Sequence, residues 1–242
     1  LDYEFVTHSD TEVLLASYIK YGEKCIDKFN GMFAFALYDQ KEKTLFCARD
    51  RIGKKPFVYS EHHSGFYFAS ELSALFSIGI FDDTPDDIGI AYSYLRNFRH
   101  IPEPYTRYKS IRRLEPAHAM IMKNQKIVKK WCYWTPSFEY DNSIKKEDVY
   151  DAVKIRERAD VEIATLLSGG VDSSVITGLM VKHGLKPKAY TLKADDEELG
   201  RAKRVAKLFD VPLKVFEYDR DLQEELYQKM MAIYGEEVRL LP

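Results

Sequence analysis

The stretch LLSGGVDSSV, residues 166–175, carries the clearest chemical signal in this sequence. It places two glycines, three serines and one aspartate directly after an apolar run that begins at Val161. A strand that ends in a glycine-rich turn and leads into a helix presents unpaired backbone N–H groups to an anion. The stretch therefore predicts a phosphate-binding loop.

Each residue type in this loop supports a separate part of the prediction. Gly169 and Gly170 allow close backbone approach to a phosphate. Asp172 would repel a bare polyphosphate, so it predicts a bound Mg²⁺ that bridges this carboxylate and the phosphates of a nucleotide. The patterns GxxxxGK(S/T) and GxGxxG are absent, which disfavours a kinase-like clamp and a dinucleotide site. The hydroxyl groups that would add further donors belong to Ser168, Ser173 and Ser174.

The sequence around the loop predicts alternating strands and helices. Strands are expected at VEIATLL (161–167), AYTLK (189–193) and VPLKVFEY (211–218). Helices are expected over residues 172–183 and 196–209, because apolar residues recur there at helical spacing. This order implies right-handed crossovers and a parallel sheet. The apolar faces of the two helices are predicted to hold Val175, Ile176, Leu179 and Met180, and Leu199, Ala202, Val205, Ala206 and Phe209.

The N-terminal half has a different texture, with many aromatic residues and short strand-like runs. SDTE at 9–12 predicts a capping box, in which Ser9 caps a helix that ends near Gly22 and Glu12 reaches back to it. MFAFALY (32–38), TLFCARD (44–50) and FYFASE (66–71) read as strands, with small residues on one face of the first. An antiparallel, layered α+β domain follows from this pattern. We place this domain at residues 1–136, a linker and connecting helix at 137–160, and an α/β domain with a parallel sheet at 161–242.

Composition and charge argue against several classes of protein. Apolar residues make up 45% and charged residues 31% of the 242, and the net charge is −2, so nothing indicates binding to nucleic acid or membranes. The longest clean apolar run near the start, Met32–Tyr38, is far shorter than the roughly 20 residues of a membrane span. Cys25, Cys47 and Cys132 lack the spacing of a zinc site or disulfide framework. They indicate reduced thiols and a cytoplasmic protein.

SGGVDSS resembles the pyrophosphate loop of the ATP pyrophosphatases, which split ATP between its α and β phosphates. The upstream half resembles, in order, the glutamine amidotransferase domain of glutamine-hydrolysing asparagine synthetases. The segments that carry this resemblance are THSDTEVLLASY (7–18), CIDKFNGMFAFALYD (25–39), LFCARDRIGKKPFVYS (45–60), FYFASELSALF (66–76) and IPEPYTRYKSIRRLEPAHAM (101–120). DAVKIRERADVEIATLLSGGVDSS (151–174) resembles the entry into the synthetase domain of that family.

The resemblance implies an N-terminal-nucleophile type of amidotransferase domain, an ATP-pyrophosphatase domain and a ligase of asparagine biosynthesis. ATP with Mg²⁺ would adenylate the side-chain carboxylate of aspartate, and ammonia from glutamine would pass through an internal tunnel to attack it. Asp10 would bind the α-amino group of glutamine, whereas Leu166, through its backbone, and Leu192 would line the adenine pocket. Val171 completes the ATP site with the loop residues named above. The expected partners are thus small molecules, and a homodimer stays open.

Some expected parts of the family pattern are missing from this sequence. The family nucleophile is an N-terminal cysteine, but this chain begins at Leu1, so no catalytic residue is identified and we expect the N-terminal part of the domain to be missing. The synthetase part is also expected to be incomplete. Arg49, Asp50 and Arg51 are predicted to form a structural ion-pair group rather than a catalytic one.

Alternatives remain open at this point. A relative could amidate another carboxylate, such as a uronic acid of a surface polysaccharide, or close a β-lactam. A protein of a different class, an inactive nucleotide-binding scaffold, would keep the loop without the chemistry. The residues that would bind the acceptor carboxylate are not in this sequence.

Overall fold

The computed structural model describes residues 3–95, 101–139, 145–193, 195–217 and 219–234. Residues 140–144 of the predicted linker and residue 218 of the third predicted strand lie outside this description. The described residues form two compact units, one up to Ser137 together with the residues from Leu226 onward, and one from Phe138 to Glu225.

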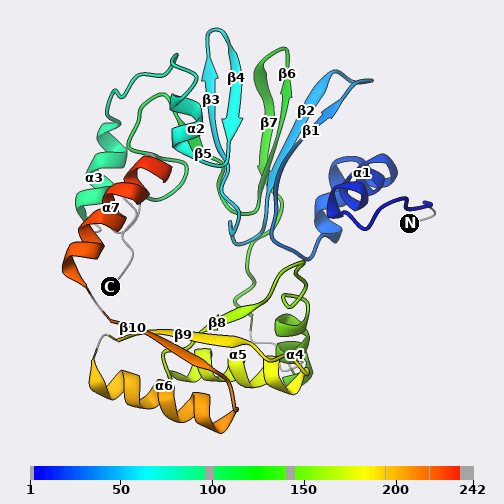
Figure 1. The fold of residues 1–242 in the computed structure, drawn as a ribbon. Coiled ribbons are helices and arrows are strands. Elements are labelled where there is room, and N and C mark those ends of the chain that lie inside the picture. The colour runs from blue at the N-terminus through cyan, green and yellow to red at the C-terminus, as the bar shows by residue number, and fades with distance from the viewer. Residues whose placement is uncertain (1–2, 96–100, 140–144, 194, 218, 235–242) are drawn as a thin grey trace. The chain divides into compact units, whose positions relative to one another are not determined.

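The first unit contains two antiparallel sheets (Figure 1). The larger sheet has the order β1-β2-β6-β7, and β1 pairs with β2 along its whole length, from Ala34 opposite Arg49 to Asp39 opposite Thr44. The smaller sheet has the order β4-β3-β5. The strands are β1 (Ala34–Asp39), β2 (Thr44–Arg49), β3 (Val58–His62), β4 (Gly65–Ala69), β5 (Arg112–Arg113), β6 (His118–Lys123) and β7 (Lys126–Cys132).

Two apolar clusters lie on opposite faces of the larger sheet. Phe33 and Phe35 pack against one cluster, which includes Phe46 and Cys25, whereas Ala34 and Ala36 pack against the other. The second cluster contains Phe57 and Tyr59 from the beginning of the smaller sheet, so the small alanine face of β1 accommodates that sheet. Burying one large side chain such as Phe46 contributes roughly 1.5–3 kcal/mol.

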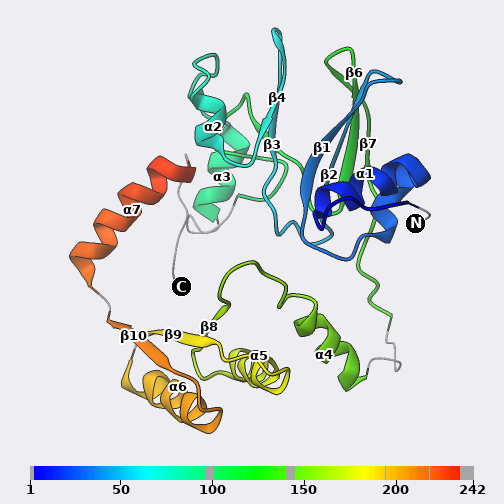
Figure 2. The ribbon, with the colours of Figure 1, turned by 45° about the vertical axis from the view of Figure 1, so that its right-hand side comes forward.

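Short helices complete the first unit. They are α1 (Asp10–Tyr21), the 3₁₀ helix η1 (Gly22–Lys28), α2 (Leu72–Phe76) and α3 (Asp87–Leu95). α1 lies beside β1 and β2 (Figure 2), where Tyr18 stacks on Phe46 with ring centroids 5.6 Å apart. It ends at Gly22, whose φ of 58° suits glycine, as the sequence predicted.

The second unit alternates strands and helices around a three-stranded parallel sheet of order β10-β9-β8. Its elements are α4 (Lys146–Lys154), β8 (Ala164–Leu166), α5 (Val171–Lys182), β9 (Lys188–Lys193), α6 (Asp196–Leu208) and β10 (Leu213–Glu217). α7 (Arg220–Tyr234) crosses the division between the units. The predicted antiparallel and parallel sheets are therefore confirmed.

α5 and α6 cover the same face of the parallel sheet (Figure 1). The core of this unit contains Leu167, Ala189, Ala202, Ala206 and Val211, and the predicted apolar face of α6 is confirmed. On α5 the prediction is partly wrong: Leu179 and Met180 are buried, but the side chains of Val175 and Ile176 are 46% and 45% exposed. Thr177 takes a fully buried position on this helix instead.

Within the described residues of the second unit, no helix covers the opposite face of the parallel sheet. Leu166 is 81% and Phe216 is 47% exposed there. Parallel sheets are ordinarily covered on both faces.

None of the described helices is long and apolar enough to span a membrane.

Candidate functional site

The loop 168–174 follows β8 of the parallel sheet and leads into the first turn of α5. Leu167 anchors its start, since its side chain is buried and its N–H donates to the Tyr190 carbonyl at 2.8 Å. Gly170 is the N-cap of α5, and no side chain in the described chain caps this helix. The first helical bond runs from Ser174 N–H to the Gly170 carbonyl at 3.0 Å. The backbone N–H groups of residues 171–173 therefore have no partners inside the helix, as at the anion-binding helix starts of other proteins.

The two loop glycines have different surroundings. A Cβ at Gly169 would lie 2.5 Å from the backbone nitrogen of Ala202 and 2.6 Å from Cβ of Arg201, and the φ of Gly169 is +78°. A Cβ at Gly170 would meet only the Ser168 hydroxyl, at 3.4 Å. Gly169 thus makes room for α6, whereas the start of α5 at Gly170 is crowded only by the Ser168 hydroxyl.

The serine hydroxyls hold the loop in shape. Ser168 Oγ accepts from the Gly170 N–H at 3.3 Å and lies 3.1 Å from Ser173 Oγ. Ser173 Oγ and Ser174 Oγ both donate to the Gly170 carbonyl, at 3.2 and 2.7 Å. The predicted phosphate donors are therefore arranged around Gly170, where their hydroxyl groups bond to other atoms of the loop.

Asp172 is exposed in the first turn of α5. Its position suits the positive end of the helix dipole. Among the described residues, no group of three or more His, Cys, Asp or Glu side chains could hold a metal ion. The carboxylate fits a hard cation only as one protein ligand of an ion that is held mainly by phosphate oxygens.

A pair of buried hydroxyls beneath the loop was not anticipated from the sequence. Thr165 Oγ1 of β8 lies 3.1 Å from Thr177 Oγ1 of α5, and Thr177 Oγ1 donates to the Ser173 carbonyl at 2.8 Å. The pair ties the strand before the loop to the helix after it. The only sequence signal was a threonine near the middle of each apolar segment, which equally suits an exposed position.

Leu166 and Leu192 lie on one face of the sheet. Leu166 pairs with Tyr190, and Leu192 follows two residues later on the same strand, so their side chains share the face that α5 and α6 do not cover. Leu192 is half-buried, whereas Leu166 is exposed. The backbone of both strands ends at the loop edge, and the adenine-binding role stays a prediction.

In the first unit, Asp10 is exposed at the start of α1. Ser9 caps this helix as predicted, accepting from Thr11 N–H at 3.2 Å. The other half of the predicted capping box is wrong: Glu12 accepts from Val6 N–H at 2.9 Å and from the Thr7 N–H at 2.7 Å, not from Ser9. The pKa of the Glu12 carboxyl is lowered, mainly by the hydrogen bond that it accepts from the Thr7 hydroxyl. The extra loop bonds thus fix the segment that precedes Asp10.

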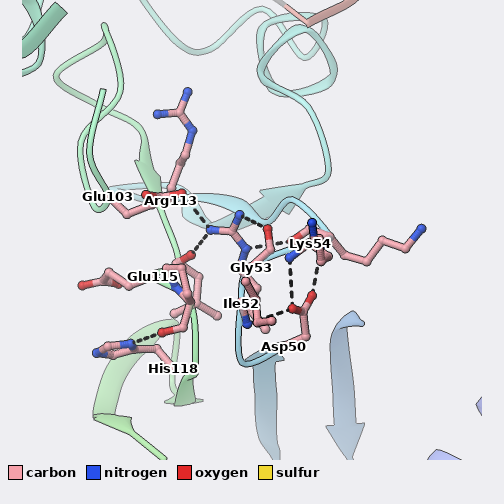
Figure 3. Close-up of polar contacts among 12 residues, drawn as sticks. Asp50, Ile52, Gly53, Lys54, Glu103, Arg113, Glu115 and His118 are labelled. Carbon is pink, nitrogen blue, oxygen red and sulfur yellow. Dashed lines mark hydrogen bonds and ion pairs between the residues drawn. The ribbon is translucent and has the colours of Figure 1, made fainter. Parts of the chain in front are cut away.

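The ARDR segment was predicted to form a structural ion-pair group, but its partners are mostly backbone groups. Figure 3 shows the Asp50 carboxylate beside the backbone of Ile52 and Lys54. The buried Arg49 guanidinium donates to the carbonyls of Lys55, Gly53 and Leu114 at 2.7, 2.8 and 2.6 Å, and it pairs with Glu103 at 3.2 Å. The Asp50 carboxylate accepts from the N–H groups of Ile52, Lys54 and Lys55 at 3.1, 3.0 and 3.0 Å. Arg51 donates to the Phe29 carbonyl at 2.7 Å. These side chains fix the backbone of the loop after β2, and Arg51 ties that loop to the Phe29 carbonyl.

Two of the three cysteines, Cys25 and Cys47, are unsuited to nucleophilic chemistry in this structure. Burial raises the pKa of Cys25 to about 11 and that of Cys47 to about 12, so both stay protonated thiols at neutral pH. Cys132 is exposed, and its thiol lies 3.0 Å from the Trp134 carbonyl. All three cysteines are free, which agrees with the prediction of reduced thiols.

Comparison with known proteins gives two adjacent family matches. Residues 1–134 match the family model of a glutamine amidotransferase domain, and residues 146–240 match that of asparagine synthase. Described residues of the loop and of α5, β9 and α6 thus lie inside the second match, and Asp10 lies inside the first.

Individual relatives agree with this pair of matches. A putative glutamine-hydrolysing asparagine synthetase 2 of Methanocaldococcus jannaschii is 34% identical over 245 residues, which cover 96% of this chain and 48% of the relative. The glutamine-hydrolysing asparagine synthetase 3 of Bacillus subtilis is 37% identical over 81% of this chain and 33% of its own length. Amidase chry2 of Gibberella zeae is 27% identical over 91% of this chain and 36% of its own length. The chain spans about half the length, or less, of these curated relatives.

Proposed function

Because this chain belongs to the family of glutamine-hydrolysing asparagine synthetases, we propose that it serves an ATP-dependent ligase that forms an amide from a carboxylate and the ammonia of glutamine. The observation that carries this proposal is the open start of α5. There Gly170 leaves space and the N–H groups of residues 171–173 have no partners within the helix. A polyphosphate is the ligand that such a site fits best.

The proposed chemistry uses this site for the departing group. A carboxylate oxygen attacks the α-phosphorus of ATP, the bond between the α- and β-phosphates breaks, and pyrophosphate leaves. Ammonia then attacks the acyl carbon, AMP leaves with the former carboxylate oxygen, and the nitrogen loses a proton. Backbone N–H groups aimed at the pyrophosphate stabilise the negative charge that develops on it. A Mg²⁺ ion held by Asp172 together with the phosphates would neutralise part of the same charge.

On the amidotransferase side, we propose that Asp10 binds the α-ammonium group of glutamine. Its exposed carboxylate and the fixed loop before it support this role. A charged hydrogen bond to the ammonium would select an amino acid over a simple amide. Cys25 and Cys47 are buried thiols with raised pKa values, so we do not place the nucleophile at either of them.

Aspartate is the proposed acceptor, and the printed names of the two asparagine synthetases above support it. A second candidate is amidation of a different carboxylate. It is favoured by one observation: Amidase chyE of Penicillium rubens, whose name is different, is 26% identical over 99% of this chain. We further propose a cytoplasmic location, since the three cysteines are free.

The test is ATP–pyrophosphate exchange by the full-length protein with a panel of carboxylates. Exchange that requires aspartate supports the proposed acceptor, whereas exchange that requires another acid favours the second candidate. The matched negative control is Asp172→Asn, which keeps the fold but removes the proposed metal ligand. If the wild-type protein binds ATP but shows no exchange with any acid, an inactive nucleotide-binding scaffold would replace the ligase.

A further inference from the structure

The Cβ atom of Arg201, in α6, lies directly beside the phosphate loop. It would be only 2.6 Å from a Cβ placed on Gly169, so the side chain leaves its helix at the surface of the loop. Helical side chains lean toward the N-terminus of their helix, and the Arg201 guanidinium does so, with Nη1 2.6 Å from Oε1 of Glu197 one turn earlier. α6 follows β9, so this end of α6 lies at the carboxyl edge of the parallel sheet. The loop after β8 lies at the same edge.

The loop itself supplies no cation for a polyphosphate. Within Ser168–Ser174 the only charged side chain is Asp172, which is negative. The positive end of α5 is equivalent to about half an elementary charge, which is small against the charge of pyrophosphate. A guanidinium, in contrast, binds two phosphate oxygens at once with a full positive charge.

The present partner of Arg201 leaves the guanidinium available. Glu197 is 84% exposed at its side chain and Arg201 is 41% exposed. An ion pair between exposed side chains at i and i+4 is held weakly in water. A phosphate oxygen at the loop can therefore replace the carboxylate without breaking a buried contact.

We propose that Arg201 is a further phosphate-binding residue of this site, which contacts the pyrophosphate part of ATP, and that a phosphate oxygen displaces Glu197 from the guanidinium when the nucleotide binds. This inference rests on the proposed function, because it takes the loop as the ATP site. It adds a cation from α6 to a site otherwise built from β8 and α5. It also gives a reason for the close packing of Gly169 on α6, since that packing brings Arg201 to the loop.

The experiment measures binding of Mg-ATP, Mg-pyrophosphate and AMP to the full-length protein by calorimetry. Arg201→Met should weaken binding of ATP and pyrophosphate by roughly ten- to hundredfold, as expected for a lost charged hydrogen bond, and leave AMP binding within about twofold. Arg201→Lys should be intermediate, because it keeps the charge without the bidentate geometry. Lys203→Met removes the same charge from an exposed position two residues away on another side of the helix, and should bind like the wild type.

Three results with the wild-type protein and Arg201→Met would decide against the inference. Wild-type pyrophosphate affinity in Arg201→Met, while the wild-type protein binds ATP, would overturn it and leave the proposed function standing. Equal weakening of AMP would overturn the assignment to the pyrophosphate part. A wild-type protein that binds neither ATP nor pyrophosphate would overturn the proposed function and this inference together. Should Arg201→Met not fold, Glu197→Gln offers a second test on an exposed residue: freeing the guanidinium should tighten pyrophosphate binding, and weaker binding would contradict the proposal.

Discussion

Gly169 lies directly against Ala202, so the phosphate loop and α6 meet through backbone atoms. A Cβ at Gly169 would come within 2.5 Å of the Ala202 nitrogen, a distance that real Cβ atoms do not show. At Gly170, the next residue, a Cβ would meet only the Ser168 hydroxyl, at 3.4 Å. The GG pair therefore combines one glycine required for packing with one that leaves room for a ligand.

This difference predicts unequal effects of two alanine substitutions. Gly169→Ala should lower the free energy of unfolding by about 2–4 kcal/mol, because it adds left-handed backbone strain to an overpacked contact. Gly170→Ala should change it by about 0.5 kcal/mol or less, since φ at this residue is −72° and the Cβ meets only a serine hydroxyl. Urea denaturation of both variants measures these values. Equal losses would show that the Gly169–Ala202 contact relaxes easily.

For Asp172 we expect a loss of magnesium dependence rather than a loss of stability. Asp172→Asn should bind ATP in the presence of Mg²⁺ as weakly as the wild type does with a chelator, because the carboxylate is the proposed protein ligand. The melting temperature should fall only slightly, since an exposed acid in a first helical turn contributes about 0.3–1 kcal/mol. Calorimetric titration with and without Mg²⁺ separates the two effects. A variant whose ATP affinity still rises with Mg²⁺ would refute this role.

Several elements could be predicted from sequence because a local pattern determines them. The alternation of alanine and phenylalanine in β1 and the glycine after α1 are examples, since each follows from the residues themselves. Glu12 shows the limit: its type and spacing fit a capping box, but its carboxylate bonds to Val6 and Thr7 instead. The chain path before the helix decides that choice, and the local pattern does not contain it.

The interior contacts of the candidate site were harder to predict, because they join distant residues. Val175 and Ile176 were expected to face the core, but Thr177 does so and meets Thr165 across the strand. Likewise, the close approach of Gly169 to α6 depends on how two helices pack on one sheet face. Hydrophobic spacing alone does not contain these contacts.

The hydrogen bonds of Arg49 predict that the shape of its guanidinium, and not only its charge, stabilises the fold. Arg49→Lys should lower the free energy of unfolding by about 2–4 kcal/mol, because a lysine ammonium cannot reach three carbonyls and Glu103 together. Lys54→Ala, at an exposed side chain in the same loop, should change it by less than about 0.5 kcal/mol. Urea denaturation of both variants gives the comparison. A loss at Arg49 as small as that at Lys54 would mean that the network adds little.

Thiol reactivity should follow burial. At about pH 8 an alkylating reagent should modify Cys132 in the folded protein, whereas Cys25 and Cys47 should react only after unfolding, because burial raises their pKa values to about 11 and about 12. Cys132→Ser should remove the fast reaction. Fast labelling of a second thiol in the native state would contradict the buried positions.

The same thiols give a pH dependence of stability. Their pKa values are raised in the folded state above the unfolded value of about 8.5, so their contribution is fully present below about pH 8.5 and is lost as the pH rises toward the folded values. Burial also raises the pKa of Tyr18, to about 12, and acts in the same direction. Urea midpoints should therefore be lower at about pH 10.5 than at about pH 7.5. A midpoint that rises over this interval would show that other groups outweigh these.

A substitution of Asp10 should distinguish the two proposed half-reactions, the release of ammonia from glutamine and the amidation of the carboxylate. In the full-length protein, Asp10→Asn should raise the KM for glutamine by roughly ten- to hundredfold, because the ammonium would lose a charged hydrogen bond. Amidation driven by added ammonia should keep its rate, since that reaction bypasses glutamine binding. Glu4→Gln, an exposed acid in the same segment, serves as the control and should change neither rate. If Asp10→Asn slows both reactions equally, the carboxylate supports the fold at the start of α1 and does not bind substrate.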